Sequence, residues 1–238
     1  MGGRVRLRQP KPGYRAGMDA ALLAAASEAA SGERVLEAGC GAGGALLQAA
    51  ARWPGAALTG VERDPVALAL AVENIALNEA TGRVAAFAGD VGAKFGALGL
   101  PRFDAAMANP PFFDDPGALR APHPARTGSY MADDGLEAWT RFLLAAVKDG
   151  GRVTVIHRAD RLGDLLALLG EKGGSIRIRP IQPFADAPAK RVLVRAVRGG
   201  KAPLMLLPAL VLHDRVGEGK HTAEAEAILR GETGLGWS

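Results

Sequence analysis

The chain has 238 residues, of which 48% are hydrophobic and 23% charged, a balance typical of a soluble globular protein. Cys40 is the only cysteine, which excludes an intramolecular disulfide and a multi-cysteine metal site, and the four histidines show no ligand spacing. The longest apolar stretch is too short to span a bilayer and contains prolines. We therefore expect a single domain over 1–238 in the cytoplasm, with no metal and no membrane segment.

The formal net charge is +4, and the positive residues gather in two segments. The first is an N-terminal arm over 1–18, where five cations precede the first acidic residue: Arg4, Arg6, Arg8, Lys11 and Arg15. The second runs from 177 to 201 and includes Lys190 and Arg191. Both segments fit a polyanionic partner such as a nucleic acid, although a solvated basic surface explains them equally well.

Strand and helix patterns alternate along the chain. Helices are expected over 20–30, 43–53, 64–78, 136–148, 158–172 and 222–230, and strands over 34–39, 57–62, 83–90, 103–109, 151–157, 175–181 and 190–197. Asp19 and Asp64 are placed to cap the first and third helices, and Pro65 suits the first position of the third. The alternation predicts an α/β fold with a mostly parallel sheet and right-handed crossovers. The short connection over 182–190 predicts that the last two strands are antiparallel.

Two further segments carry no helix or strand pattern. Residues 113–135 form a long stretch rich in proline and glycine, which is typical of a binding loop, and we expect a substrate loop there. Residues 232–238 are expected to form a flexible C-terminal tail.

A glycine-rich turn, "EAGCGAGG", joins the first core strand to the next helix. Gly39, Gly41 and Gly44 satisfy the dinucleotide spacing, and Glu62 ends the second strand about twenty residues later. This pattern fits a nicotinamide enzyme as well as a methyltransferase. A tight turn that binds nothing is the structural alternative.

Acidic residues at the strand ends favour a cofactor that carries adenosine and an amino acid. Glu37 lies at the mouth of the turn, where it would repel a pyrophosphate but attract the ammonium group of a methionine moiety. Glu62 can accept from both hydroxyls of a ribose, and Asp90 can accept from an adenine amine. Cys40 is interpreted as a small turn residue, because no histidine base lies near it in sequence.

The fourth strand ends on the sequence "NPPF", residues 109–112. The carboxyl end of this strand is where open α/β sheets place their ligands. Asn109 and the Pro110 carbonyl could accept the two N–H groups of an exocyclic amine, Pro111 would hold them rigid, and Phe112 offers a face for an extruded base. A proline-rigidified turn with a core phenylalanine is the alternative.

With these motifs the chain resembles a class I, S-adenosylmethionine-dependent methyltransferase. The segments "QPKPGYRAGMDAALLAAA" and "AKRVLVRAVRGGKAPLMLLPALVLH" are similar to the beginning and end of the bacterial valine-tRNA adenine-N6 methyltransferase family. The resemblance implies a Rossmann-like, seven-stranded sheet with the last strand antiparallel and helices on both faces. It also implies methylation of adenosine 37 in tRNA.

The resemblance places Arg15, Gly17 and Asp19 near the methionine end of the cofactor, and together with the motifs and the charge distribution it gives two sets of candidate residues. The candidate cofactor contacts are Arg15, Gly17, Asp19, Glu37, Gly39, Cys40, Gly41, Gly43, Glu62, Arg63, Asp90, Val91 and Asn109. The candidate RNA contacts are Arg4, Arg6, Arg8, Lys11, Arg126, Lys190 and Arg191.

The target remains open between several classes of substrate. Phe112 stands where the tRNA enzymes often have tyrosine, and phenylalanine is frequent in ribosomal RNA guanine and adenine methyltransferases. A protein glutamine presents the same pair of N–H groups, although enzymes of that type carry a helical domain before the cofactor domain. DNA adenine methylation and a nicotinamide oxidoreductase are weaker alternatives, because the first lacks a target-recognition domain here and the second leaves "NPPF" unexplained.

Overall fold

The computed structural model describes residues 2–9, 17–111, 135–216 and 220–238. Nearly all of the expected substrate loop over 113–135 lies outside the described residues, as do Lys11, Arg15, Phe112 and Arg126. Across the described ranges, no helix has the length and apolar character that crossing a membrane requires.

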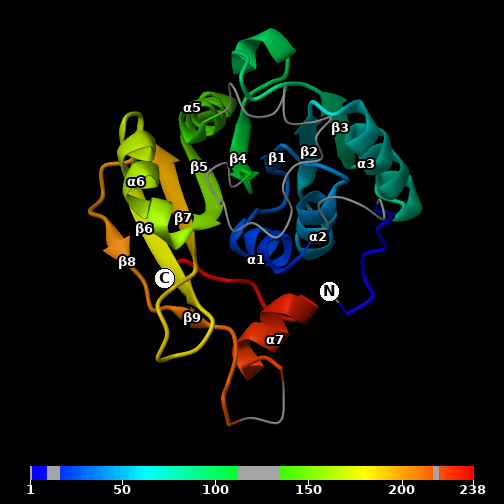
Figure 1. The fold of residues 1–238 in the computed structure, drawn as a ribbon. Coiled ribbons are helices and arrows are strands. Elements are labelled where there is room, and N and C mark those ends of the chain that lie inside the picture. The colour runs from blue at the N-terminus through cyan, green and yellow to red at the C-terminus, as the bar shows by residue number, and fades with distance from the viewer. Residues whose placement is uncertain (1, 10–16, 112–134, 217–219) are drawn as a thin grey trace, which may run out of the picture.

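One sheet contains all described strands, in the order β3-β2-β1-β4-β5-β7-β6-β8, with β9 also pairing with β6 (Figure 1). The strands are β1 (Arg34–Ala38), β2 (Ala57–Glu62), β3 (Val84–Ala88), β4 (Phe103–Ala108), β5 (Val147–Arg158), β6 (Gly173–Gln182), β7 (Arg191–Arg198), β8 (Met205–Leu206) and β9 (Leu210–Val211). Strand β7 runs antiparallel to β5 and β6, and the other described pairs are parallel. The expected fold class is confirmed, whereas the two-residue strands β8 and β9 add to the seven that were expected.

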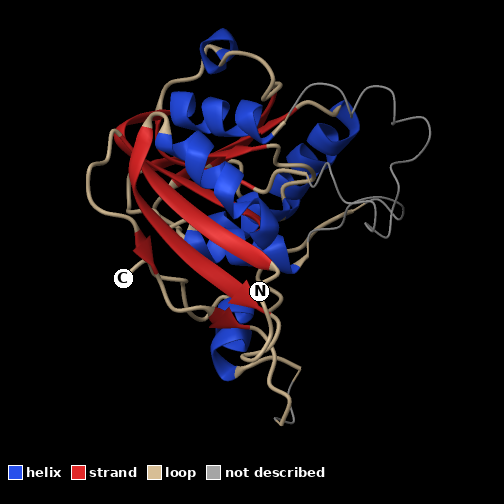
Figure 2. Ribbon diagram, turned by 60° about the vertical axis from the view of Figure 1, so that its left-hand side comes forward, coloured by secondary structure: helices blue, strands red, loops and turns tan. Residues whose placement is uncertain are grey.

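Helices cover both faces of the sheet, as Figure 2 shows. One face packs against α1 (Met18–Ala26), α2 (Gly44–Arg52), α3 (Pro65–Leu77) and α7 (Ala223–Arg230), and the other against α5 (Leu136–Ala146), α6 (Leu162–Gly170) and the 3-10 helix η1 (Phe95–Leu98). A second 3-10 turn, η2 (Ala159–Arg161), precedes α6. Val35 belongs to the first core and the next residue, Leu36, to the second. This alternation along a strand buried on both faces explains the nearly continuous apolar runs of the sequence.

Helix α1 begins two residues before the expected position and ends at Ala26. Gly17 is its N-cap residue, so Asp19 lies in the first turn and the expected cap by Asp19 was wrong. The Asp19 carboxylate instead accepts from Arg191 Nε at 3.1 Å. The expectation for α3 is confirmed, because the Asp64 carboxylate accepts from the Val66 amide at 2.8 Å.

The C-terminal segment is packed against the body of the protein, so the expectation of a flexible tail over 232–238 was wrong. Leu235 and Trp237 are each only 3% exposed. The Trp237 indole N–H donates to the Ala26 carbonyl oxygen at 2.7 Å, and the Leu235 amide donates to the Ala25 carbonyl oxygen at 2.9 Å. These bonds satisfy carbonyl groups at the end of α1, which would otherwise lack partners.

Candidate active site

The glycine turn between β1 and α2 adopts backbone conformations with positive φ, which its glycines allow. Gly39, Gly41 and Gly43 have φ values of +64°, +54° and +83°, a region that favours glycine. A Cβ atom on Gly39 would lie 2.3 Å from Cη2 of Trp139, because the α5 tryptophan packs directly on this glycine. The turn therefore presents bare backbone at the carboxyl end of β1, where a ligand can approach closely.

Glu62 holds this turn in place from the end of β2. One carboxylate oxygen accepts from the Gly41 amide at 2.8 Å, and the other accepts from the Asp64 amide at 2.9 Å. Each carboxylate oxygen has a second lone pair, so Glu62 keeps the capacity to accept from a diol.

Glu37 is the least satisfied acidic side chain of the site. It is 4% exposed, and its Oε2 atom has no hydrogen-bond partner among the described residues. Burial raises the pKa of Glu37 well above its usual range, and the nearby Glu62 carboxylate raises that pKa further. A buried carboxyl group of this kind favours a cationic ligand, because a positive charge beside it would offset its desolvation.

A further acidic residue of the site, Asp90, follows the end of β3. The Asp90 carboxylate accepts from the Gly92 amide at 2.8 Å and lies 3.8 Å from the guanidinium of Arg63. Val91 is buried, which places an apolar side chain next to this carboxylate. An aromatic ring with an exocyclic amine suits such a combination of acceptor and apolar surface.

Cys40 is buried in the turn and packs against β2. Burial raises the pKa of its thiol well above the usual range, and the carboxylates of Glu37 and Glu62 raise it further. A Cβ atom on Gly60 would lie 2.6 Å from the Cys40 sulfur, which shows how closely the turn packs against β2. The thiol therefore stays protonated and acts as a small apolar side chain.

Asn109 lies beside the glycine turn. Strands β1 and β4 are paired with Ala38 opposite Ala108, so Gly39 and Asn109 follow at the same edge of the sheet. Asn109 is half-buried, Pro110 is buried and Pro111 is exposed. The structure thus brings the two predicted motifs together, although Phe112 lies outside the described residues.

The basic residues predicted to bind RNA are largely engaged within the protein. Arg4 donates to two carbonyl oxygens at the end of α7, Arg6 donates to the Leu77 carbonyl oxygen at 2.7 Å, and Arg8 pairs with Glu73 at 3.4 Å. Asn74 and Asn78 of α3 also bond the backbone of this arm. The arm is therefore anchored along α3, as Figure 1 shows.

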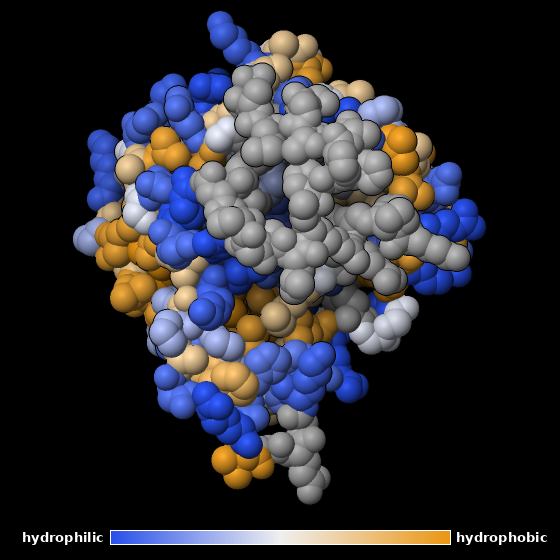
Figure 3. Space-filling view, viewed as in Figure 1, coloured by the Kyte–Doolittle hydropathy of each residue, from blue (hydrophilic) through white to orange (hydrophobic). Residues whose placement is uncertain are grey.

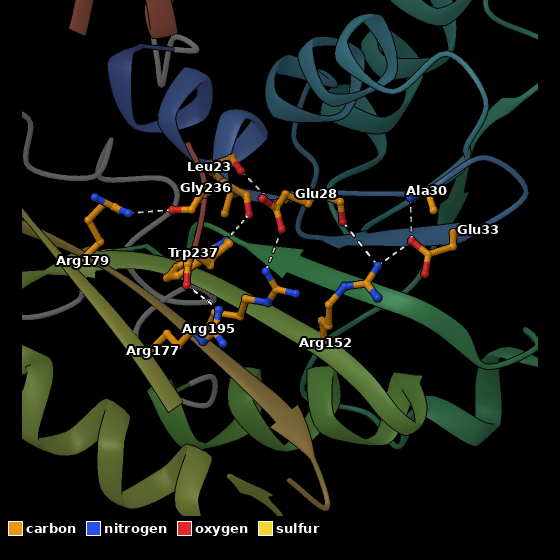
Figure 4. A network of polar contacts seen from close by, with 12 residues as sticks. Leu23, Glu28, Ala30, Glu33, Arg152, Arg177, Arg179, Arg195, Gly236 and Trp237 are labelled. Atoms are coloured by element: carbon orange, nitrogen blue, oxygen red, sulfur yellow. Dashed lines mark hydrogen bonds and ion pairs between the residues drawn. The ribbon is translucent and has the colours of Figure 1, made fainter. Parts of the chain in front are cut away.

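The second basic stretch also makes internal contacts. Arg191 is paired with Asp19, while Lys190 is exposed at the start of β7. Four arginines on β5, β6 and β7 bind carbonyl oxygens or carboxylates of the segments around α1 and the C-terminus: Arg152, Arg177, Arg179 and Arg195 (Figure 4). The sequence placed Arg177, Arg179 and Arg195 in a basic segment, because their acceptors lie far away in the chain and leave no local signal.

Trp139 was missed as a site residue by the sequence analysis. Its ring contacts the first glycine of the turn, and its indole N–H is buried with no partner among the described residues. A tryptophan in an amphipathic helix is typical of a core residue, so its position against the turn could not be inferred from the helix pattern.

Comparisons with known proteins agree with this geometry. The family described as Methyltransferase small domain matches residues 16–121. Two curated relatives from strains of Porphyromonas gingivalis, both named tRNA1(Val) (adenine(37)-N6)-methyltransferase, are 34% and 32% identical over 158 and 187 residues. These matches cover 63% and 75% of this chain, and 61% and 72% of the relatives' own lengths.

Two further comparisons bear on fold and substrate. A ribosomal protein uL3 glutamine methyltransferase from Bradyrhizobium diazoefficiens is 32% identical over 140 residues, which are 56% of this chain and 43% of that protein. A crystal structure described as a predicted O-methyltransferase, protein Atu636 from Agrobacterium tumefaciens, superposes with a TM-score of 0.77 at 26% identity, covering 91% of this chain and 98% of that one.

The fold and the glycine-acid site together define a class I methyltransferase that uses S-adenosylmethionine. Within this class, the chain belongs to the tRNA1(Val) (adenine(37)-N6)-methyltransferase family. The resemblance drawn from the motifs is thereby confirmed. The residues also fit the cofactor, because Glu37 offers an unpartnered buried oxygen to an ammonium group and the position of a Cβ atom on Gly41 has no other atom within 4 Å.

Proposed function

We propose that this protein methylates the exocyclic amine of an RNA base, and that the base is adenine at N6 in tRNA, at position 37 beside the anticodon. The observation that carries this proposal is the register that sets Asn109 next to the glycine turn at one edge of the sheet. The names of the two Porphyromonas relatives support the choice of tRNA and of adenine. A tRNA substrate also agrees with a cytoplasmic location.

The acidic residues would hold the cofactor in one orientation. Glu37 would pair with its ammonium group, Glu62 would accept from the ribose hydroxyls, and Asp90 would accept from the adenine amine. Trp139 packs directly on Gly39, so only glycine fits there and the backbone of the turn is held in one position. When bound, S-adenosylmethionine supplies a methyl group on a positively charged sulfur.

Asn109 and Pro110 would prepare the amine for transfer. The lone pair of an exocyclic amine is delocalised into the base, which makes the nitrogen a poor nucleophile. The Asn109 side-chain oxygen and the Pro110 carbonyl oxygen each accept one N–H, which directs the lone pair out of the ring plane. Proline fixes both acceptors before the substrate arrives, so orientation contributes to the rate. Methylation would leave the amine nitrogen positively charged and therefore acidic, so its proton can be lost to water without a strong base.

Methylation of a protein glutamine is the second candidate function. The Bradyrhizobium relative, whose name includes ribosomal protein uL3, supports it, and a glutamine amide presents the same two N–H groups to Asn109. We favour RNA because the Porphyromonas match over 187 residues covers more of this chain and more of the relative.

Mass spectrometry of digested substrates decides between these functions. The protein would be incubated with S-adenosylmethionine and, separately, with unmodified tRNA, ribosomal RNA and ribosomal proteins. A methyl group on N6 of adenosine in tRNA is the expected result. Methylated guanosine in ribosomal RNA, or methylated glutamine, would overturn the proposal in favour of the corresponding alternative.

A further inference from the structure

A cavity of about 520 Å³ lies between the N-terminal arm, the start of α1 and the segment that leads into α7. Part of its lining is apolar, with Val5, Leu7, Met18 and Leu229, and part is polar, with Gln48, Lys220 and two histidines. No acidic residue is among the described residues of the lining. Figure 3 shows hydrophilic and hydrophobic surfaces intermixed on the face of the molecule that Figure 1 also presents. The volume and the mixed lining suit a small planar ligand with an anionic group.

One wall of the cavity lies near the carboxyl end of β6, the edge of the sheet where the glycine turn and Asn109 also lie. Strand β6 is parallel in direction to β1 and β4, and the amide of His213 donates to the Pro183 carbonyl oxygen just beyond its carboxyl end. Gly17, which also lines the cavity, starts α1 next to the Asp19 and Arg191 pair. A single substrate lying along this edge could reach both sites.

Aromatic rings form one wall of the cavity. His213 and His221 stack with ring centroids 5.0 Å apart and an interplanar angle of 23°. The ring centroids of Phe184 and His213 are 5.5 Å apart. The guanidinium carbon of Arg215 lies over the Phe184 ring, 4.2 Å from its centroid. Rings stacked in this way offer a flat face to a further ring.

His221 has an unused hydrogen-bonding atom. Its Nδ1 is buried and has no partner among the described residues, whereas Nδ1 of His213 is bonded to the Lys220 carbonyl oxygen at 2.6 Å. Lys220 is one of the lining residues, and it is exposed. The wall therefore combines a free ring nitrogen, which can bond to a base edge, with a cation for a phosphate.

We propose that this cavity binds an unpaired nucleotide of the RNA substrate, one that flanks the target base. The base lies against His221 and the apolar side chains, and its phosphate faces Lys220. Arg215 is paired with Asp186 at 3.2 Å, so it supports the ring of Phe184 rather than the phosphate. This inference rests on the proposed RNA substrate and adds a second contact that holds the RNA while Asn109 acts.

The test compares two cavity variants with one control. Lys220→Glu reverses the charge on the rim and His221→Ala removes the stacking face, while Lys172→Glu makes the same charge change at an exposed position outside the cavity and outside both basic segments. Affinity for a bacterial tRNA pool is measured by filter binding. Both cavity variants should weaken binding about tenfold, and the control less than about twofold. For Lys220→Glu the slope of log affinity against log salt should fall by about 0.7.

Cross-linking and cofactor binding distinguish a lost RNA contact at the cavity from a variant that is misfolded. Irradiated transcripts that contain 4-thiouridine should cross-link to the peptide that holds His221, and S-adenosylhomocysteine should raise the melting temperature of both cavity variants as it does for the wild type. Wild-type affinity in both variants, or equal losses with Lys172→Glu, would overturn the cavity while leaving the proposed function intact. If the wild-type protein binds no RNA at all, the proposed function fails and this inference fails with it.

Discussion

The two halves of the sheet bury charge in opposite ways. Around β1 and β2, Glu37 is buried with one oxygen unpartnered and its pKa raised. Around β5, β6 and β7, the partly buried arginines are met by acceptors of the protein itself, such as the Glu28 carboxylate, 2.9 Å from Arg195 (Figure 4). The first half leaves a buried carboxylate oxygen without a partner among the described residues, whereas each of the four arginines of the second half has at least one acceptor there.

This difference separates a binding site from a structural network. Removing one partner of a buried ion pair leaves an uncompensated charge, so the arginine network should contribute to folding. A buried carboxyl group without a partner opposes folding and is retained where a ligand needs it. Substitutions in the arginine network should therefore lower the free energy of unfolding more than they lower ligand binding. Substitutions around Glu37 should lower ligand binding more than the free energy of unfolding.

The largest effect is expected at Asn109, in the ligand-binding half. Asn109→Ala removes one of the two acceptors for the amine, so methyl transfer should fall roughly thousandfold, or about 4 kcal/mol in activation free energy. Transfer of a radiolabelled methyl group measures this loss, while calorimetry with S-adenosylhomocysteine should show nearly unchanged affinity. Turnover close to that of the wild type would mean that Asn109 is not the acceptor.

The next effect is expected at Trp237, whose carbonyl oxygen accepts from Arg177 in the structural half. Trp237→Ala removes a buried ring and its bond to Ala26, so the free energy of unfolding should fall by about 3 kcal/mol and the melting temperature by roughly 6–12 °C. Calorimetric melting measures it, and Trp237→Phe should recover most of the loss. An unchanged melting temperature would show that the C-terminal segment does not stabilise the fold.

A smaller loss is expected at Arg195. Arg195→Met leaves Glu28 without its partner, and because Glu28 is 41% exposed the cost should be about 2 kcal/mol in unfolding free energy. Arg230→Met is the matched control, since its pair with Glu226 lies on the surface, 58% and 40% exposed, and its loss should leave the free energy of unfolding nearly unchanged. Equal losses in chemical denaturation would contradict a structural role for the network.

The smallest effect has the opposite sign and depends on pH. Because the pKa of Glu37 is raised in the folded protein, this carboxyl favours folding below its unfolded pKa of about 4.3 and loses that contribution as pH rises through the folded pKa. Without cofactor, Glu37→Gln should thus be more stable than the wild type at pH 8, by about 1–2 kcal/mol, and close to it near pH 4. Melting curves against pH check this, with the exposed Glu73→Gln as a control that should show no such trend.

Sequence predicted the elements with local signals and failed where distant segments meet. The cap at Asp64 and the antiparallel pair β6 and β7 follow from short motifs, and the glycine turn follows from its spacing. The C-terminal tail was misjudged because a segment of seven residues is too short to establish a periodic pattern. The only sign of its burial was the pair of large apolar residues Leu235 and Trp237, two positions apart. The arginine network could not be predicted, because each cation meets acceptors from remote parts of the chain.

The most direct test compares the melting temperatures of Glu37→Gln and Arg195→Met with and without S-adenosylhomocysteine. At a ligand concentration about 100 times the wild-type Kd, binding should stabilise the wild type by about 2.7 kcal/mol. Arg195→Met should start lower but keep the full upward shift, whereas Glu37→Gln should start no lower and lose most of it. A full shift in Glu37→Gln, or a lost shift in Arg195→Met, would contradict the division of the sheet into a ligand-binding half and a structural half.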